Sequence, residues 1–189
     1  MTLIRTVDPV AEPVTLAEAK AHLRIDHTDD DELLAGLVRA ARQEVERSTG
    51  MALLLQSWRL VLDDLPESGC ALVRIHPLRE VQSVTAFGSE GEGAVVDPAT
   101  YQVDSVSRPA RIHFTASVAP LRAMNGLEID FTAGFGEAGT DVPDPLKRAI
   151  LLLVAHWYEF RAGYGPADQP VSYPAGFDRI VAGYRAGRL

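Results

Sequence analysis

Residues 128–153 read EIDFTAGFGEAGTDVPDPLKRAILLL, and this stretch joins a strand-like segment to a helix-like segment. Three of its glycines, Gly134, Gly136 and Gly139, match the G-x-G-x-x-G pattern of dinucleotide-binding loops. Such a loop needs a helix that begins inside the motif, so that the amides of its first turn meet a pyrophosphate. The fold and the function both depend on whether these glycines bind a nucleotide or only shape a joint.

The residues that follow the glycines argue against a nucleotide loop. The segment TDVPDP at residues 140–145 delays the helix and puts two acids where an anion would bind. Glu159 stands about 20 residues on, where these folds carry an acidic ribose ligand, but it lies in a predicted helix rather than at the end of a strand. We therefore expect the glycines to turn the chain sharply off the strand, Gly134 above all. A small nucleotide-binding enzyme that uses residues 134–139 is kept as the alternative function.

On the C-terminal side of the joint, Pro143 and Pro145 predict the start of a helix, because proline is tolerated in a first turn. The helix is expected to run to about Phe160. A helix that is apolar nearly all round is either central to a core or shared with a neighbouring subunit. One face carries Leu146, Ala149, Ile150, Leu153, Val154 and Trp157, and the other carries Leu151, Leu152, Ala155 and Tyr158. Its surplus apolar surface predicts subunit-interface residues, namely Leu151, Leu152, Trp157 and Tyr158.

On the N-terminal side of the joint, the sequence has the two-residue period of β-strands. Leu127, Ile129 and Phe131 form the apolar edge of the last strand. Turn residues separate the earlier candidates, which are SWRLVLDDLP (57–66), ALVRIHP (71–77), VQSVTAF (81–87), TYQVDS (100–105) and ARIHF (110–114). Residues 54–134 are therefore predicted to form an antiparallel β unit inserted between helices.

Two further helices are predicted ahead of the β unit. Thr15 and Glu18 form a capping box that opens a short helix to about Leu23. A second helix is expected to start at Asp29, Asp30 and Asp31, because the amides at a helix start are partly positive, and to end at Gly50. Its apolar stripe is formed by Leu33, Leu34, Leu37, Val38, Ala41 and Val45, while Arg39, Arg42 and Arg47 are expected to face elsewhere.

The predicted fold class is therefore α+β. A helical bundle is expected from residues 15–53 and 141–161, with an N-terminal helix pair and a long C-terminal helix. The β unit at 54–134 is inserted into it. Residues 1–14 are expected to be an extended arm, and residues 162–189 a linker and a C-terminal docking arm.

The composition limits the classes of function. The 189 residues carry a net charge of −8, whereas a protein that grips DNA phosphates is normally basic. Cys70 is the sole cysteine, so neither an internal disulfide nor a cysteine-based zinc site is expected. No signal peptide and no apolar run long enough for a bilayer is recognised, so a soluble protein without a membrane partner is predicted. The pairs His22/His27 and His156/Glu159 match no compact metal site, and no catalytic residue, cofactor or metal is expected.

The C-terminal stretch YPAGFDRIVAGYRAGRL (173–189) is the segment that a monomer's own core explains least. It places apolar residues on one face, and three arginines but no acid follow from residue 179 onward. A frayed, solvated end and an arm that docks on a partner both fit this pattern. The arm hypothesis predicts that deleting residues 174–189 leaves a folded chain that has lost its partner.

Several stretches together resemble the phage head–tail connector proteins of the gp6-like and phiE125 gp8-like group. They are PVTLAEAKAHLRIDHTDDDELLAGLVRAARQEVERSTG (13–50), IHPLREVQSVTAF (75–87), YQVDS (101–105), PARIHF (109–114), IDFTAGFG (129–136), VPDPLKRAILLLVAHWYEFR (142–161) and GYR (183–185). Each stretch is a weak signal alone, and their order along one chain makes the resemblance specific.

The resemblance implies a structural adaptor at the head–tail junction of a tailed phage or a phage-like gene transfer agent, assembled in the host cytoplasm. Members of the family form a ring under the portal protein, which implies twelve copies, a DNA channel through the ring, and attachment of the next tail component, a stopper or tail terminator. No catalytic residue carries over. The C-terminal segment implies portal contacts at Phe177, Ile180, Val181, Tyr184, Arg185 and Arg188.

The acidic composition agrees with a conduit through which DNA slides without sticking. The first 50 residues hold ten acids and six Lys or Arg, a net charge of −4. Asp29, Asp30 and Asp31 are therefore expected to face the channel.

Overall fold

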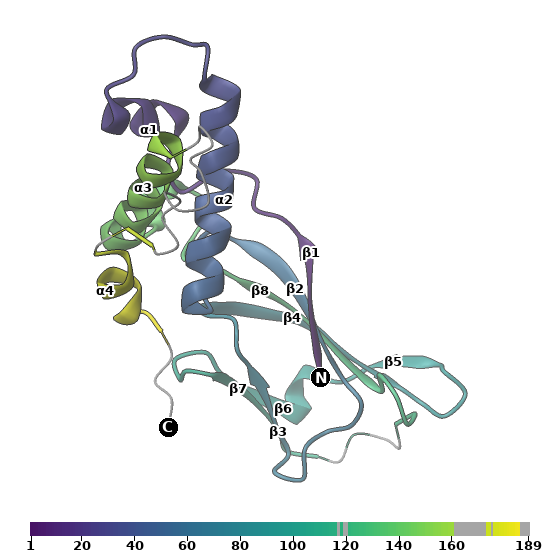
Figure 1. The fold of residues 1–189 in the computed structure, drawn as a ribbon. Coiled ribbons are helices and arrows are strands. Elements are labelled where there is room, and N and C mark those ends of the chain that lie inside the picture. The colour runs from purple at the N-terminus through teal and green to yellow at the C-terminus, as the bar shows by residue number, and fades with distance from the viewer. Residues whose placement is uncertain (117, 119–120, 161–172, 175, 186–189) are drawn as a thin grey trace, which may run out of the picture. The chain divides into compact units, whose positions relative to one another are not determined.

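The computed structural model describes residues 1–116, 118, 121–160, 173–174 and 176–185. It is an α+β structure in which all strand pairs are antiparallel, as predicted (Figure 1). The chain divides into two compact units. The sheet unit comprises Met1–Pro9 and Leu55–Phe135, and the helical unit comprises Val10–Leu54 and Gly136–Leu189.

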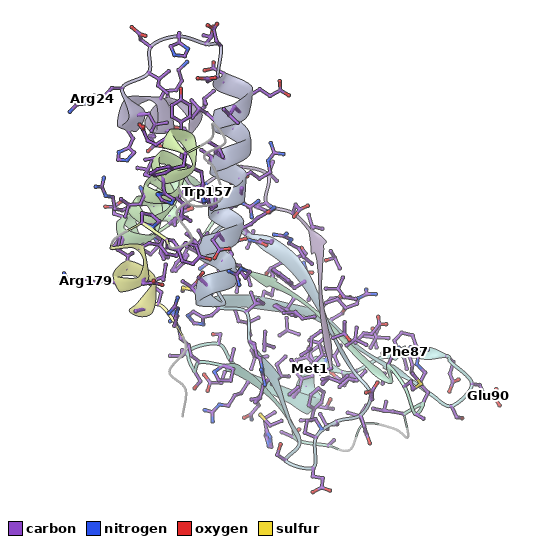
Figure 2. All side chains as sticks on the ribbon, viewed as in Figure 1. Met1, Arg24, Phe87, Glu90, Trp157 and Arg179 are labelled. Atoms are coloured by element: carbon purple, nitrogen blue, oxygen red, sulfur yellow. The ribbon has the colours of Figure 1, made fainter. Side chains whose placement is uncertain are left out.

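The sheet unit contains two antiparallel sheets. The five-stranded sheet has the order β1-β2-β8-β4-β5, and the three-stranded sheet has the order β3-β7-β6. The first is formed by β1 (Thr2–Val7), β2 (Gln56–Leu62), β4 (Leu78–Phe87), β5 (Gly93–Val95) and β8 (Leu127–Ala133). The second is formed by β3 (Cys70–Val73), β6 (Tyr101–Asp104) and β7 (Ala110–Phe114). The hairpin of β4 and β5 carries Phe87 and Glu90 at its tip (Figure 2).

Side chains alternate between the two faces of each sheet. Leu60 pairs with Ile129 and both are fully buried, whereas the next pair, Arg59 and Asp130, is partly exposed. In the three-stranded sheet, Ile112 is buried between exposed neighbours. Each sheet therefore buries one apolar face in the core of the unit, which the period of two in the sequence predicted.

The prediction of an arm at residues 1–14 is wrong for its first part, because Thr2–Val7 form the edge strand β1. This strand pairs with β2, so that Ile4 lies opposite Arg59. Arg5 fixes it further. Its guanidinium lies 5.6 Å from the centre of the Trp58 ring, and its Nη1 donates to Gln56 Oε1 at 3.3 Å.

The helical unit contains α1 (Leu16–Leu23), α2 (Asp31–Thr49), α3 (Asp144–Glu159) and α4 (Phe177–Ala182). The predicted capping box opens α1: Thr15 Oγ1 accepts the Glu18 amide at 3.1 Å and Glu18 Oε2 accepts the Thr15 amide at 2.7 Å. The C-cap of α2 is Gly50 with a φ of 69°, again as predicted. Helix α3 runs beside α2 and contacts α1 and α4 (Figure 1).

The core of this unit follows most of the predicted stripes, but Leu33 of the α2 stripe is 40% exposed, Leu37 and Trp157 are half-buried, and one charged residue is buried. Leu34, Val38, Ala41 and Val45 of α2 are buried, as are Leu146, Ala149, Ile150, Leu153 and Val154 of α3. Arg42, which we expected to face away from the stripe, is only 3% exposed. Its burial is possible because two carboxylates pair with it. The spacing of apolar residues along a helix does not show whether a charged residue has such partners.

Candidate assembly surfaces

The glycine-rich joint has steric roles at each of its three glycines. Gly134 directly follows β8 with a φ of 140°, and its amide donates to Pro77 O at 3.0 Å. A side chain is rarely tolerated at such a φ, so the prediction of a sharp turn at Gly134 is confirmed.

The other two glycines allow close approaches. A Cβ at Gly136 would lie 2.1 Å from Asp141 Oδ2, and one at Gly139 would lie 2.7 Å from Pro13 O. Asp141 Oδ2 also accepts the Ala138 amide at 3.0 Å, so the chain's own carboxylate occupies the loop. A negative group at this place opposes a phosphate, and the glycines serve packing rather than nucleotide binding.

The acids at the start of α2 are partly used inside the unit. Asp31 Oδ1 pairs with Lys20 Nζ at 2.6 Å, and Asp30 Oδ2 accepts the Tyr158 hydroxyl at 2.5 Å. Asp29 is exposed. Of the three predicted channel residues, only Asp29 is therefore exposed.

The predicted interface residues of α3 lie at the border of the core. Leu151, Leu152, Trp157 and Tyr158 are all half-buried. Trp157 lies on α3 within the helical unit (Figure 2). The hydroxyl of Tyr158 donates to Asp30 within the helical unit. Leu151, Leu152 and Trp157 are then the large apolar side chains of the predicted set that stay half-buried.

The C-terminal segment packs onto the helical unit. Phe177 and Val181 are fully buried, Ile180 and Tyr184 are half-buried, and Arg185 is exposed. Arg188 lies outside the described residues. This burial argues against the expectation that deletion of residues 174–189 leaves the fold intact, because the deletion would remove two core side chains.

Polar contacts add to this packing. Arg185 Nε donates to Ser48 O at 3.1 Å, and the Tyr173 ring stacks on Phe177 with centroids 4.8 Å apart. The Tyr173 hydroxyl donates to Glu44 Oε1 at 2.5 Å. Burial alone would raise the pKa of Glu44, but hydrogen bonds from Arg47, Tyr173 and Ser48 outweigh it and lower that pKa below 4.5.

A buried charge cluster surrounds Arg42, and it was not predicted from the sequence. Arg42 Nε lies 2.7 Å from Glu12 Oε2, and its Nη1 lies 2.8 Å from Glu46 Oε2. Burial alone would lower the pKa of Arg42, but the bond to Glu12 and the charge of Glu46 outweigh it, so this pKa is raised. A signal would have been the i, i+4 pair of Arg42 and Glu46, but Glu12 is thirty residues away.

An open hollow of about 420 Å³ lies on the outer face of the three-stranded sheet. Its lining is formed by Cys70, Gln102, Val103, Asp104, Arg111 and His113. Arg111 Nη2 pairs with Asp104 Oδ2 at 2.6 Å, so the hollow carries no unbalanced charge from these two groups. This balance leaves it without a clear preference for an anion or a cation.

Neither a metal centre nor a membrane span is found in the described part of the chain. No three His, Cys, Asp or Glu side chains come close enough together there to hold a metal ion. Within the same residues, no helix combines the length and the apolar character that crossing a membrane requires.

Comparison with known proteins gives a family match over part of the chain and structural matches over all of it. Residues 13–75 match the model of the phage gp6-like head-tail connector proteins, which is 63 of the 189 residues. A chain in the neck of an empty GTA particle, computed with C6 symmetry, is 26% identical, with a TM-score of 0.83. A chain in the neck of a native GTA particle with C12 symmetry is also 26% identical, with a TM-score of 0.82.

Both structural matches cover 100% of this chain and 97% of the other. A chain in the virion of the native gene transfer agent (GTA) matches with the same coverage and a TM-score of 0.81. No curated protein matches the sequence. The resemblance predicted from the sequence is confirmed: the chain is similar to gp6-like head–tail connectors over residues 13–75 and to neck components of gene transfer agent particles over its whole length.

Proposed function

We propose that this protein is a structural head–tail adaptor of a tailed phage or a phage-like gene transfer agent, in the neck between head and tail. One observation carries the proposal: the whole chain matches a neck chain with a TM-score of 0.83, and that chain is itself covered to 97%. The connector family match over residues 13–75 supports the same role independently. Neither comparison points to an enzyme.

The adaptor acts as a ring of twelve copies, which agrees with the C12 symmetry of one matching neck. A cyclic ring needs two different faces per subunit, because each copy touches its two neighbours with different surfaces. The half-buried Leu151, Leu152 and Trp157 on α3 supply apolar area for one of these faces. The helices form the ring as a bundle, with α1 and α2 as the N-terminal pair and α3 as the C-terminal helix.

The C-terminal segment supplies the contact with the portal protein. Phe177 and Val181 hold α4 on its own unit, so the partner meets the more exposed Ile180, Tyr184 and Arg185. Anchors of this kind combine an aromatic ring, an aliphatic group and an arginine, which are typical of interface centres. Further partners are the next tail component and the DNA that passes through the ring. Asp29 faces the channel in this arrangement.

The proposal is tested by measuring the mass of the purified chain alone and after mixing with the portal protein encoded in the same gene cluster. Light scattering should show a complex with twelve adaptor copies, and electron micrographs should show a ring with C12 symmetry. A chain that never associates with the portal protein, and that is absent from purified particles, would rule out the adaptor role.

A charge reversal separates the proposed docking surface from the rest of α4. Arg185→Glu should weaken portal binding at least tenfold, because a paired interface charge is replaced by a repulsive one. Arg179→Glu is the matched control in the preceding helix α4, and Arg179 is also exposed. An equal loss of portal binding in both variants would show that binding depends only on net charge. The proposed contact of Arg185 with the portal protein would then be wrong.

The nucleotide-binding alternative has a direct test. A ligand that binds the folded state raises the thermal midpoint by mass action. Because Asp141 occupies the loop, neither NAD nor ATP should raise the midpoint of the isolated chain. A saturable increase that Gly136→Ala abolishes would revive the alternative.

A further inference from the structure

The chain passes between its two units three times, at Pro9/Val10, at Leu54/Leu55 and at Phe135/Gly136. Each crossing leads into or out of a short segment of the helical unit, namely residues 10–13, 51–54 and 136–139. Segments that connect compact units are flexible by default, and the units they join then move relative to each other. The contacts made by these three segments therefore decide how freely the units move.

The first segment is tied to α2 by a buried charge. Arg42 Nε lies 2.7 Å from Glu12 Oε2, with the Arg42 side chain 3% exposed and that of Glu12 28% exposed. The pair is strong because water screens it little. Breaking it would leave Arg42 buried with one carboxylate fewer.

The second segment is tied to the same cluster through Glu46. One oxygen of Glu46, Oε2, pairs with Arg42 Nη1 at 2.8 Å. The other oxygen, Oε1, accepts the backbone amide of Leu53 at 3.0 Å. Arg42 therefore orients the carboxylate that holds the segment leaving α2.

The third segment packs against the first. A Cβ at Gly139 would lie 2.7 Å from Pro13 O and 3.3 Å from Glu12 O. The glycine thus lets residues 136–139 lie directly on the backbone that Glu12 anchors. The first two segments are therefore held at one place on α2, and the third packs on the first.

We propose that Arg42, Glu12 and Glu46 form a crossover lock that holds two of the connecting segments on α2, with the third packed on the first, and thereby restricts the motion of the sheet unit relative to the helical unit. A buried ion cluster costs desolvation, and an apolar replacement of similar size is often as stable. Unlike an apolar replacement, the ion cluster fixes the positions of two chain segments through directed hydrogen bonds. This inference does not depend on the proposed adaptor function.

The test measures the spread of distances between the two units. Two exposed sites, Arg39 on α2 and Gln82 on β4, are replaced by cysteine in a Cys70→Ser background and spin-labelled. Glu12→Ala then removes one carboxylate but leaves Arg42 paired with Glu46, so the helical unit remains folded. Pulsed electron resonance should show a clearly broader distance distribution in Glu12→Ala than in the parent.

Hydrogen exchange of the intact chain provides a second measurement. Amide exchange at Val14, which is buried next to this segment, should accelerate roughly tenfold or more in Glu12→Ala, since a buried charge pair no longer holds the segment. Exchange inside α2 should stay unchanged. Arg47→Gln is the matched control, because it removes an exposed ion pair from the same helix.

The outcomes separate cleanly. A broader distribution with Glu12→Ala but not with Arg47→Gln supports the lock. A parent distribution that is already as broad as the variant's would overturn it. So would an unchanged distribution in a variant whose Val14 amide exchanges rapidly, because the released segment would then have no effect on the motion of the units.

Discussion

Arg42 in the helical unit and Arg59 in the sheet unit each pair with two carboxylates. Arg59 lies 2.7 Å from Asp130 and 2.9 Å from Glu128, distances close to those around Arg42. The difference is exposure, with 39% for the Arg59 side chain and 3% for that of Arg42. An arginine with two carboxylates is therefore a surface ion cluster in the sheet unit. In the helical unit, the same kind of cluster is buried and holds connecting segments in place.

The largest effect should come from breaking the buried cluster. Arg42→Gln leaves Glu12 and Glu46 without their cation and should cost about 3–5 kcal/mol. The chain has two tryptophans, Trp58 in the sheet unit and Trp157 in the helical unit. Unfolding in urea followed by fluorescence in a Trp58→Phe background reports the helical unit alone. A loss below about 1 kcal/mol would place Arg42 in the same class as Arg59.

The next effect tests the tight packing beside that cluster. Gly139→Ala pushes a methyl group against Pro13 O and should destabilise the helical unit by about 1–3 kcal/mol. Gly36→Ala is the matched control in α2, where a Cβ meets open space. Because alanine is the better helix former, this control should stabilise the unit by roughly 0.5–1 kcal/mol. Equal changes in stability for the two substitutions would show that the backbone near Gly139 accommodates a methyl group without cost.

The exposed cluster should respond weakly. Arg59→Gln should cost about 0–1 kcal/mol, since water and salt screen a half-exposed pair. The measurement is unfolding in a Trp157→Phe background, in which Trp58 reports the sheet unit. Raising the salt concentration should remove most of the difference between parent and variant. A salt-independent loss of stability as large as that of Arg42→Gln would show that the exposed and the buried cluster contribute equally to their units.

Local features of the fold were predictable because their partners are close in sequence. Thr15 and Glu18 are three residues apart, and their capping box appears as predicted. The alternation of Leu127, Ile129 and Phe131 likewise identified a strand with one buried face. In each case a few neighbouring residues contain the whole physical cause.

Features with distant partners were missed. Strand β1 needs β2, about fifty residues on, before its backbone is paired, and Arg42 needs Glu12, thirty residues away. Phe177 and Val181 show the limit most clearly. Their spacing gives an apolar face, but a face of this kind packs equally well on its own unit or on a partner.

The smallest effect concerns the exposed contacts that help hold the C-terminal segment. The pKa of Glu44 is lowered in the folded chain, so its contribution to stability is present above pH 4.5 and is lost as the pH falls through the lowered value. Acidification through this lowered pKa should therefore protonate Glu44 and weaken its bond to Tyr173. Hydrogen exchange at residues 176–184 should accelerate below that pKa, beyond the intrinsic change in rate.

Glu44→Gln should show this looser docking already at neutral pH and respond less to acid. Glu159→Gln, an exposed substitution on α3, is the control that should keep the acid response of the parent. The expected change is below about 1 kcal/mol, because Arg47 and Tyr173 are both exposed to water. If Glu44→Gln retained the full acid response, protonation of another carboxylate would loosen the C-terminal segment. The Glu44 contacts would then contribute as little to stability as the exposed cluster of Arg59.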